Sequence, residues 1–295
     1  MRHTTSRQTD AYGGRLKAKL IDSFKKMSLK KKILVTGVSK GIGKAIALDL
    51  IGKGHEILGT CRNPHTLSDK ISGVKYFALD LKDENSIQNC FEAVGEIDVL
   101  INNAGESQMG PAEEMSDKEV RDIFETNFFG TISLTKKFIP AMRRKKKGLI
   151  INISSLSGRF AVPFQSSYAS SKIALNTWTL CIRKELRPFH VSVSLLEPYF
   201  IKSGIKTDYI VDERSAYKKM TDRVSESRKA TLNKAKEPEV VAKTVAKIIE
   251  SKSPKGIYIS GGMGPFYALL NRFLTSSRAE KMTNKVTGLT GDDLV

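Results

Sequence analysis

Tyr168 and Lys172 have the residue types and the spacing needed for proton transfer. They stand four residues apart in the segment YASSK, and residues i and i+4 share one face of a helix. A nearby cation favours the phenolate, so we expect Lys172 to lower the pKa of Tyr168 from its ordinary value of about 10. A tyrosine perturbed in this way can act as a general acid or base near neutral pH.

A second feature is the glycine-rich segment TGVSKGIG, which spans residues 36–43 and follows the apolar run Ile33–Val35. A strand that leads into such a turn and then into a helix is typical of dinucleotide-binding proteins. We expect Gly37 to permit the tight turn. Gly41 and Gly43 are expected to let the backbone and the helix approach a pyrophosphate, whose charge suits a helix N-terminus.

Short apolar segments alternate with helical patterns along the chain, which indicates a parallel sheet covered on both faces. The predicted strands are Ile33–Thr36, Glu56–Thr60, Val74–Leu79, Ile97–Ile101, Leu149–Ile153, Val191–Leu196 and Gly256–Ser260. Helices are predicted from the glycine turn to about Leu50, near Asp83–Val94 and near Ser167–Leu186. The sequence shows no internal repeat and no low-complexity linker, so we predict one α/β domain.

These motifs, with the NNAG segment at residues 102–105, Ser155 and Asn127, resemble the short-chain dehydrogenase/reductase family from about Ile33 to Ser260. The resemblance implies a single-domain Rossmann-type fold, a doubly wound parallel sheet with helices on both faces. It also implies an oxidoreductase that moves a hydride between a nicotinamide cofactor and a carbonyl or alcohol carbon.

The resemblance implies a role for each catalytic residue. Tyr168 would exchange a proton with the substrate oxygen, and Ser155 would hydrogen-bond that oxygen. Lys172 would lower the tyrosine pKa and hold the nicotinamide ribose. Asn127, within the segment TNFFG, would organise a chain of waters that carries protons to solvent.

Cofactor choice follows from the end of the second strand, where the segment TCRN at residues 60–63 has no acid for a ribose 2′-hydroxyl. The guanidinium of Arg62 suits a 2′-phosphate instead, and Lys40 adds a second cation. We therefore expect NADP(H). The cofactor-binding residues implied by the resemblance are Gly37, Ser39, Lys40, Gly41, Ile42, Gly43, Arg62, Asp80, Leu81, Asn103, Ala104, Gly105, Tyr168, Lys172, Pro198, Ile201 and Ser203.

One segment departs from the family pattern. Residues 198–203 stand where the family usually has Pro-Gly-x-x-x-Thr, so Tyr199 replaces a glycine and Ser203 keeps a hydroxyl near the carboxamide. We expect Tyr199 to reshape the nicotinamide pocket.

The substrate is expected to meet residues 205–236, where the family builds its lid. The apolar candidates there are Tyr209, Ile210, Val211, Tyr217 and Met220. The apolar run after Ser260 is similar to the tails of family members that act on steroids, retinoids and lipid-derived ketones, which favours a bulky apolar substrate. The alternative for this run is a helix that packs on the domain or on a second subunit.

The alternative function for the protein is a non-catalytic NADPH-binding regulator, which would need no proton donor.

The chain has 295 residues and a formal net charge of +18. We divide it into a basic N-terminal extension (1–30), a catalytic domain (31–262) and a C-terminal tail (263–295). The extension has apolar residues at near-helical spacing among lysines, which leaves three alternatives: a membrane-surface helix, a transit-like peptide, or a stretch ahead of a true start at Met27. The basic run at residues 143–147 is predicted to be a solvated helix end.

The three scattered cysteines predict neither a disulfide framework nor a metal site and fit a reducing compartment. No apolar run of spanning length is present in the sequence. We therefore expect a cytoplasmic protein with a small-molecule substrate and no nucleic-acid partner. Peripheral membrane association, through the basic N-terminus or the tail, and homo-oligomerisation remain open alternatives.

Overall fold

The computed structural model describes residues 30–205, 207–271 and 276–289. Within them, seven strands form one sheet in the order β3-β2-β1-β4-β6-β7-β9, and every neighbouring pair is parallel. The strands are β1 (Lys32–Val35), β2 (Glu56–Cys61), β3 (Val74–Ala78), β4 (Val99–Asn102), β6 (Gly148–Ile153), β7 (Val191–Pro198) and β9 (Ile257–Ser260).

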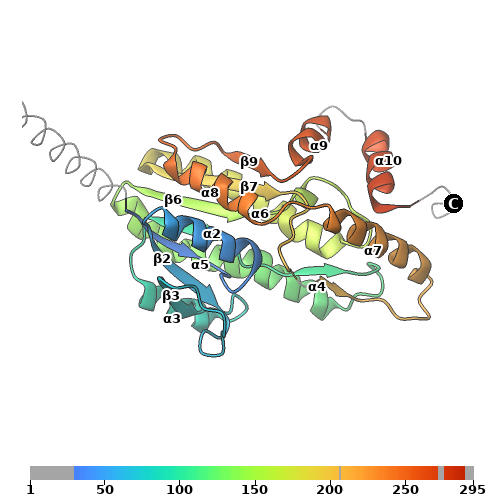
Figure 1. The fold of residues 1–295 in the computed structure, drawn as a ribbon, viewed down its shortest axis with the longest axis horizontal. Coiled ribbons are helices and arrows are strands. Elements are labelled where there is room, and N and C mark those ends of the chain that lie inside the picture. Colours follow the sequence, from blue (N-terminus) through green and yellow to red (C-terminus); the bar gives the residue numbers. More distant parts are fainter. Residues whose placement is uncertain (1–29, 206, 272–275, 290–295) are drawn as a thin grey trace, which may run out of the picture.

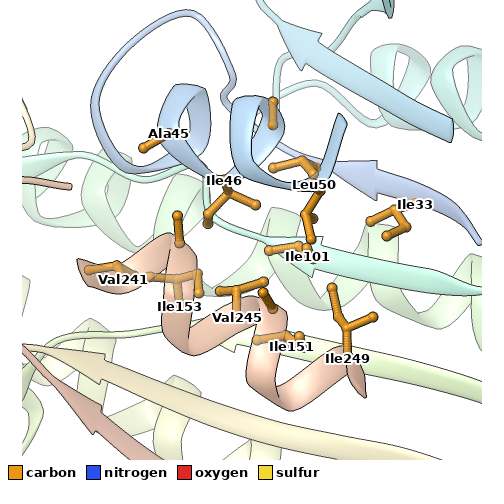
Figure 2. Close-up of a cluster of buried hydrophobic side chains, with 14 of the residues drawn as sticks. Ile33, Ala45, Ile46, Leu50, Ile101, Ile151, Ile153, Val241, Val245 and Ile249 are labelled. Atoms are coloured by element: carbon orange, nitrogen blue, oxygen red, sulfur yellow. The ribbon is translucent and has the colours of Figure 1, made fainter. Parts of the chain in front are cut away.

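Helices cover both faces of this sheet (Figure 1). They are α2 (Gly41–Gly52), α3 (Glu84–Val94), α4 (Asp117–Phe124), α5 (Gly130–Arg144), α6 (Ser166–Leu186), α7 (Lys218–Asn233), α8 (Glu239–Glu250), α9 (Gly264–Asn271) and α10 (Ser276–Thr287). Because successive side chains of a strand point to opposite faces, Ile33 packs in one core and Leu34 in the other. Figure 2 shows the first core, where side chains of α2 and α8 such as Ile46 and Val245 meet Ile151 of the sheet. The expected doubly covered parallel sheet is confirmed.

The strand order reverses between β1 and β4. The chain moves from β1 outward to β3, then returns to place β4 on the other side of β1. Ligands of open α/β sheets bind at such a switch point, beyond the carboxyl ends of the strands. The glycine turn follows β1 and the NNAG segment follows β4, so both open onto this point.

A second, two-stranded sheet was not predicted. It pairs β5 (Ser107–Met109) in parallel with β8 (Thr207–Tyr209) and so ties the lid segment to the chain after the NNAG segment. Strands of three residues are too short to show a period in the sequence.

The basic run at residues 143–147 forms the end of α5 and the turn after it, with all five side chains exposed, as expected of a solvated helix end. The extension at residues 1–29 lies outside the described residues. Among the helices that the structure describes, none combines the length and the apolar character that crossing a bilayer requires.

Candidate active site

A cavity of about 810 Å³ opens at the carboxyl ends of the strands. Its walls come from the turns after β1, β4, β6 and β7, and from α6, α7 and α10. Nearly all of the predicted site residues line it. The exceptions are Gly41, Gly43 and Asn127.

The glycine turn is compact because its glycines allow close backbone contacts that a Cβ atom would block. Gly37 and Gly41 have positive φ angles of 72° and 58°, which glycine adopts at little cost. A Cβ on Gly41 would lie 1.8 Å from the carbonyl oxygen of Ser203, and one on Gly43 would lie 2.1 Å from that of Gly37. These two glycines therefore bring the turn, the helix and the segment after β7 together, rather than lining the cavity themselves.

The start of α2 fits a pyrophosphate. Its N-cap residue, Lys40, makes no side-chain capping bond, so the first N–H groups of the helix are free to face an anion. The buried hydroxyls of Thr126 and Ser154 also line the cavity and have no hydrogen-bond partner among the described residues. A polar ligand in the cavity would satisfy such groups.

Hydrogen bonds connect the NNAG segment to the glycine turn. The hydroxyl oxygen of Thr36 accepts from the backbone N–H groups of Asn103 and Ala104, both at 2.9 Å. The side-chain amide of Asn103 donates to the carbonyl oxygens of Thr36 and Gly37, at 2.9 and 3.1 Å. The two switch-point turns are thus held as one rigid surface.

Arg62 and Lys40 lie at the outer edge of the cavity and are exposed. The Arg62 side chain is 78% exposed, and its Nη1 is 3.8 Å from Oε1 of Glu106. Lys82 also pairs with Glu106, at 3.1 Å. An exposed ion pair at 3.8 Å is weak, so Arg62 can turn toward a phosphate.

Asn127 lies in a single π-helical turn, Glu125–Phe129, between α4 and α5. Such turns are rare and occur frequently at functional sites. The Asn127 amide donates to the Glu106 carbonyl and to Ser171 Oγ, both at 3.1 Å, and its Oδ1 accepts from the Glu106 N–H at 2.9 Å. Asn127 is thereby fixed behind Gly105, on which a Cβ would lie 3.0 Å from Asn127 Oδ1 and 3.4 Å from Lys172 Nζ.

Ser155 and Tyr168 both line the cavity. The Oγ of Ser155 accepts from the Ser157 N–H at 3.1 Å, which leaves its own hydroxyl hydrogen to donate. A side-chain hydrogen bond joins Ser155 to Tyr168. Burial raises the pKa of Tyr168, while Ser155 and the charge of Arg228 lower it by less.

The expected lowering of the Tyr168 pKa by Lys172 is therefore wrong for this structure. The Lys172 ammonium lies 5.9 Å from the centre of the Tyr168 ring and donates to the Ile153 carbonyl at 3.5 Å. Lys172 is itself buried, and burial lowers its pKa to about 8. Desolvation disfavours both the Tyr168 phenolate and the Lys172 ammonium. It outweighs the electrostatic attraction between them that the i, i+4 spacing suggested.

Tyr199 lies in the cavity wall, where a glycine was expected. Its ring packs on Tyr267 of α9, with ring centres 5.4 Å apart, and on Phe200 at 5.0 Å. Burial raises the pKa of Tyr199 to about 12. Tyr199 and Tyr267 both line the cavity, so the tail is connected to the segment after β7.

The lid contacts differ from those expected. Of the five apolar candidates, Tyr209 lines the cavity, whereas Tyr217 packs on Phe164 and Met220 packs against the buried cluster of Met109, Val224 and Leu289. Further residues of α7 and α10 that were not predicted also line it: Val224, Arg228, Leu232, Asn233, Met282, Thr283, Val286 and Thr287. The i, i+4, i+8 spacing of Val224, Arg228 and Leu232 was a usable signal, but a lysine- and arginine-rich helix obscures it.

The tail therefore packs on the domain, as one of its two alternatives proposed. Ser227 of α7 donates to the carbonyl oxygen of Val286 in α10 at 2.8 Å. Leu289 joins Val224 and Met109 in a small buried cluster. The apolar run after Ser260 contributes to the cavity through Tyr267.

Comparison with known proteins connects this arrangement to one group of enzymes. A family profile described as short chain dehydrogenase matches residues 31–214. The chain is 36% identical over 185 residues to the 3-ketodihydrosphingosine reductase of Bacteroides thetaiotaomicron, covering 61% of this chain and 68% of that relative.

Two solved structures are similar over most of the chain. A short-chain dehydrogenase from Streptomyces avermitilis superposes with a TM-score of 0.73 at 28% identity, covering 86% of this chain and 97% of that one. A short-chain dehydrogenase from Burkholderia cenocepacia, in complex with NADP, gives 0.68 at 25% identity, covering 85% and 95%.

Proposed function

This chain belongs to the short-chain dehydrogenase family, and we propose that it transfers a hydride between NADP(H) and a carbonyl or secondary-alcohol carbon. The observation that carries the proposal is the meeting of Ser155, Tyr168 and Lys172 in one cavity with the glycine turn. A proton donor is needed beside the carbonyl oxygen only if the bound cofactor reacts, which argues against a purely regulatory NADPH-binding protein.

In the direction of reduction, Tyr168 donates its phenolic proton to the carbonyl oxygen, and Ser155 donates a hydrogen bond to the same oxygen. NADPH, when bound, supplies the hydride. Lys172 lines the cavity one helical turn from Tyr168, with its ammonium 5.9 Å from the centre of the ring, and it would hold the nicotinamide ribose. Asn127 holds the Glu106 backbone and Ser171, and so orients the α6 turn that presents Tyr168.

The preference for NADP(H) over NAD(H) rests on Arg62 and Lys40, which line the outer end of the cavity. No acid occupies the end of β2, where NAD enzymes hold the ribose 2′-hydroxyl. The Burkholderia structure, solved with NADP, supports the choice.

We expect Arg62→Asp to weaken NADPH binding by at least about tenfold, or roughly 1.4 kcal/mol, because a carboxylate would face the 2′-phosphate. Titration of both cofactors by NAD(P)H fluorescence measures it. Lys70→Asp, which makes the same charge change at an exposed site outside the cavity lining, is the control and should leave both affinities unchanged. An unaltered NADPH affinity in Arg62→Asp would refute the assignment.

For the substrate, we propose a bulky, largely apolar ketone. The far end of the cavity has walls of Val224, Leu232, Met282 and Val286. The Bacteroides relative is named for a ketone derived from a sphingoid base. The test is NADPH oxidation against a panel of long-chain ketones, steroids and acyl-dihydroxyacetone phosphates. Turnover of at least one should exceed that of acetone, and binding of NADPH without turnover of any would favour the regulator.

The division into a basic extension, a catalytic domain and a tail stays a proposal, as does peripheral association with anionic membranes. Met263, Phe266 and Leu269 at the start of the tail are more than half exposed. The net charge of +18 suits an anionic surface.

We expect the chain to sediment with vesicles that contain phosphatidylserine, and to do so less as salt rises, since each lysine near the surface contributes about 1 kcal/mol. A chain that starts at Met27 should sediment less and still reduce ketones. Vesicles of phosphatidylcholine alone are the control. Equal sedimentation of the two chains would exclude the extension as an anchor, and loss of activity would place it in the folded domain.

A further inference from the structure

Arg228 is a cation inside the substrate end of the cavity. It follows Val224 and precedes Leu232 by one helical turn each, and all three line the cavity from one face of α7. Arg228 is half-buried, and its Nη2 donates to Oγ1 of Thr207 at 3.2 Å. Thr207 itself lines the cavity from β8, so the unexpected small sheet holds the partner of Arg228 in place.

The Arg228 guanidinium has no carboxylate in an ion pair with it among the residues that the structure describes. By contrast, Arg62 and Lys202, two other cations that line the cavity, have Glu106 at 3.8 Å and Glu237 at 2.8 Å. A guanidinium has five N–H donors, and the hydrogen bond to Thr207 uses one. An oxyanion that replaced water at the remaining donors would form charge-assisted hydrogen bonds, which are stronger than those to neutral acceptors.

The position of Arg228 relates it to the reacting centre. Its charge is close enough to lower the pKa of Tyr168. On its other side, Met282 and Val286 of α10 complete an apolar wall, where α10 lies beside α7 (Figure 1). A ligand that fills this space presents apolar chain to α7 and α10 and one polar group to Arg228.

We propose that Arg228 and Thr207 form a subsite for an oxyanion, a carboxylate or a phosphate group, on an amphiphilic ketone substrate. The inference rests on the proposed reductase function and narrows its substrate to an anionic lipid-like ketone. Guanidinium suits both oxyanions because its planar fork can donate two parallel hydrogen bonds. A substrate whose head group is an ammonium would be repelled by this subsite.

The first test compares a straight-chain keto fatty acid with its methyl ester, which keeps the chain and the ketone and replaces the carboxylate by a neutral group that is one methyl larger. The wild-type protein should reduce the acid with a kcat/KM at least about tenfold above that of the ester, and Arg228→Gln should lose this preference, chiefly through the KM of the acid. Arg228→Lys should retain part of it. Lys229→Gln, which removes the neighbouring exposed cation, should keep the wild-type ratio. Equal kcat/KM for acid and ester in the wild-type protein would overturn the subsite.

The second test needs no turnover. The NADPH complex is titrated with dodecyl phosphate, dodecanoate and dodecanol, and NADPH fluorescence reports binding. At least one of the two anions should bind at least about tenfold more tightly than dodecanol, and Arg228→Gln should remove the difference. The anion that binds more tightly shows whether the subsite prefers a phosphate or a carboxylate. Anions that bind no better than dodecanol overturn the subsite. If the anions bind but no ketone is reduced, the proposed function fails while the subsite stands.

Discussion

Tyr168→Phe is expected to lower kcat by about 10²–10⁴, the range that a positioned general acid contributes, and to leave the NADPH dissociation constant unchanged. The ring remains and still packs beside Lys172, whose ammonium is 5.9 Å from its centre. The lost hydroxyl is the group that hydrogen-bonds Ser155 in the cavity. An interaction made only in the transition state affects kcat and kcat/KM equally.

Steady-state kinetics on the best ketone of the panel, with NADPH fluorescence titration in parallel, measures both quantities. Tyr217→Phe is the matched control, because it removes a phenolic hydroxyl from a ring that packs on Phe164 outside the cavity lining. It should retain wild-type turnover. If Tyr168→Phe keeps most of its kcat, Tyr168 is not the acid.

Lys172→Met is expected to make the protein more stable and far less active. Lys172 is a buried cation whose pKa falls from 10.5 to about 8, with burial as the cause. That shift corresponds to a cost of roughly 3 kcal/mol at neutral pH, because each pKa unit equals about 1.36 kcal/mol. Losing the hydrogen bond to the Ile153 carbonyl offsets about 1 kcal/mol. The free energy of unfolding should therefore rise by about 2 kcal/mol, while kcat falls at least about tenfold.

The pH dependence of this stability difference follows from the sign of the shift. The folded state holds the Lys172 proton less tightly than the unfolded state, so the cost is complete below a pH of about 8. It declines as pH rises from about 8 towards the unfolded value of 10.5 and then disappears. The advantage of methionine should decline over the same interval.

Urea denaturation of both proteins at several pH values measures this difference. Lys184→Met changes an exposed lysine on the same helix and should show no such pH dependence. If Lys172→Met is less stable than the wild type at neutral pH, the prediction is wrong. The buried ammonium would then have a stabilising partner other than the Ile153 carbonyl.

The sheet could be predicted from the sequence because each of its strands is a short apolar run next to a turn signal. Ile33–Val35 before the glycine turn is one example, and β4 before the NNAG segment is another. Predicted and observed strand ends differ by at most two residues, and several coincide. Burial on both faces leaves little freedom in which side chains such strands can have.

The π-helical turn at Asn127 could not be predicted, because the extra backbone residue leaves no mark on residue types. Arg228 was missed for a different reason. Helix α7 is rich in charged residues all around, so the sequence does not show which side of it faces the cavity. That side is defined by the packing of β8 and α10 against the helix. The Tyr168 pKa was misjudged because spacing shows proximity to a cation but not the depth of burial that opposes it.

The central claim is that this cavity transfers a hydride from NADPH to a carbonyl carbon while Tyr168 protonates the oxygen. NADPH deuterated on the nicotinamide carbon that donates the hydride, in separate preparations of the two stereoisomers, tests it most directly with mass spectrometry of the alcohol product. We expect one deuterium on the carbinol carbon from one stereoisomer and none from the other, and with Tyr168→Phe we expect the labelled alcohol to form at least about 10²-fold more slowly. NADPH bound with no labelled alcohol from any ketone of the panel would contradict it.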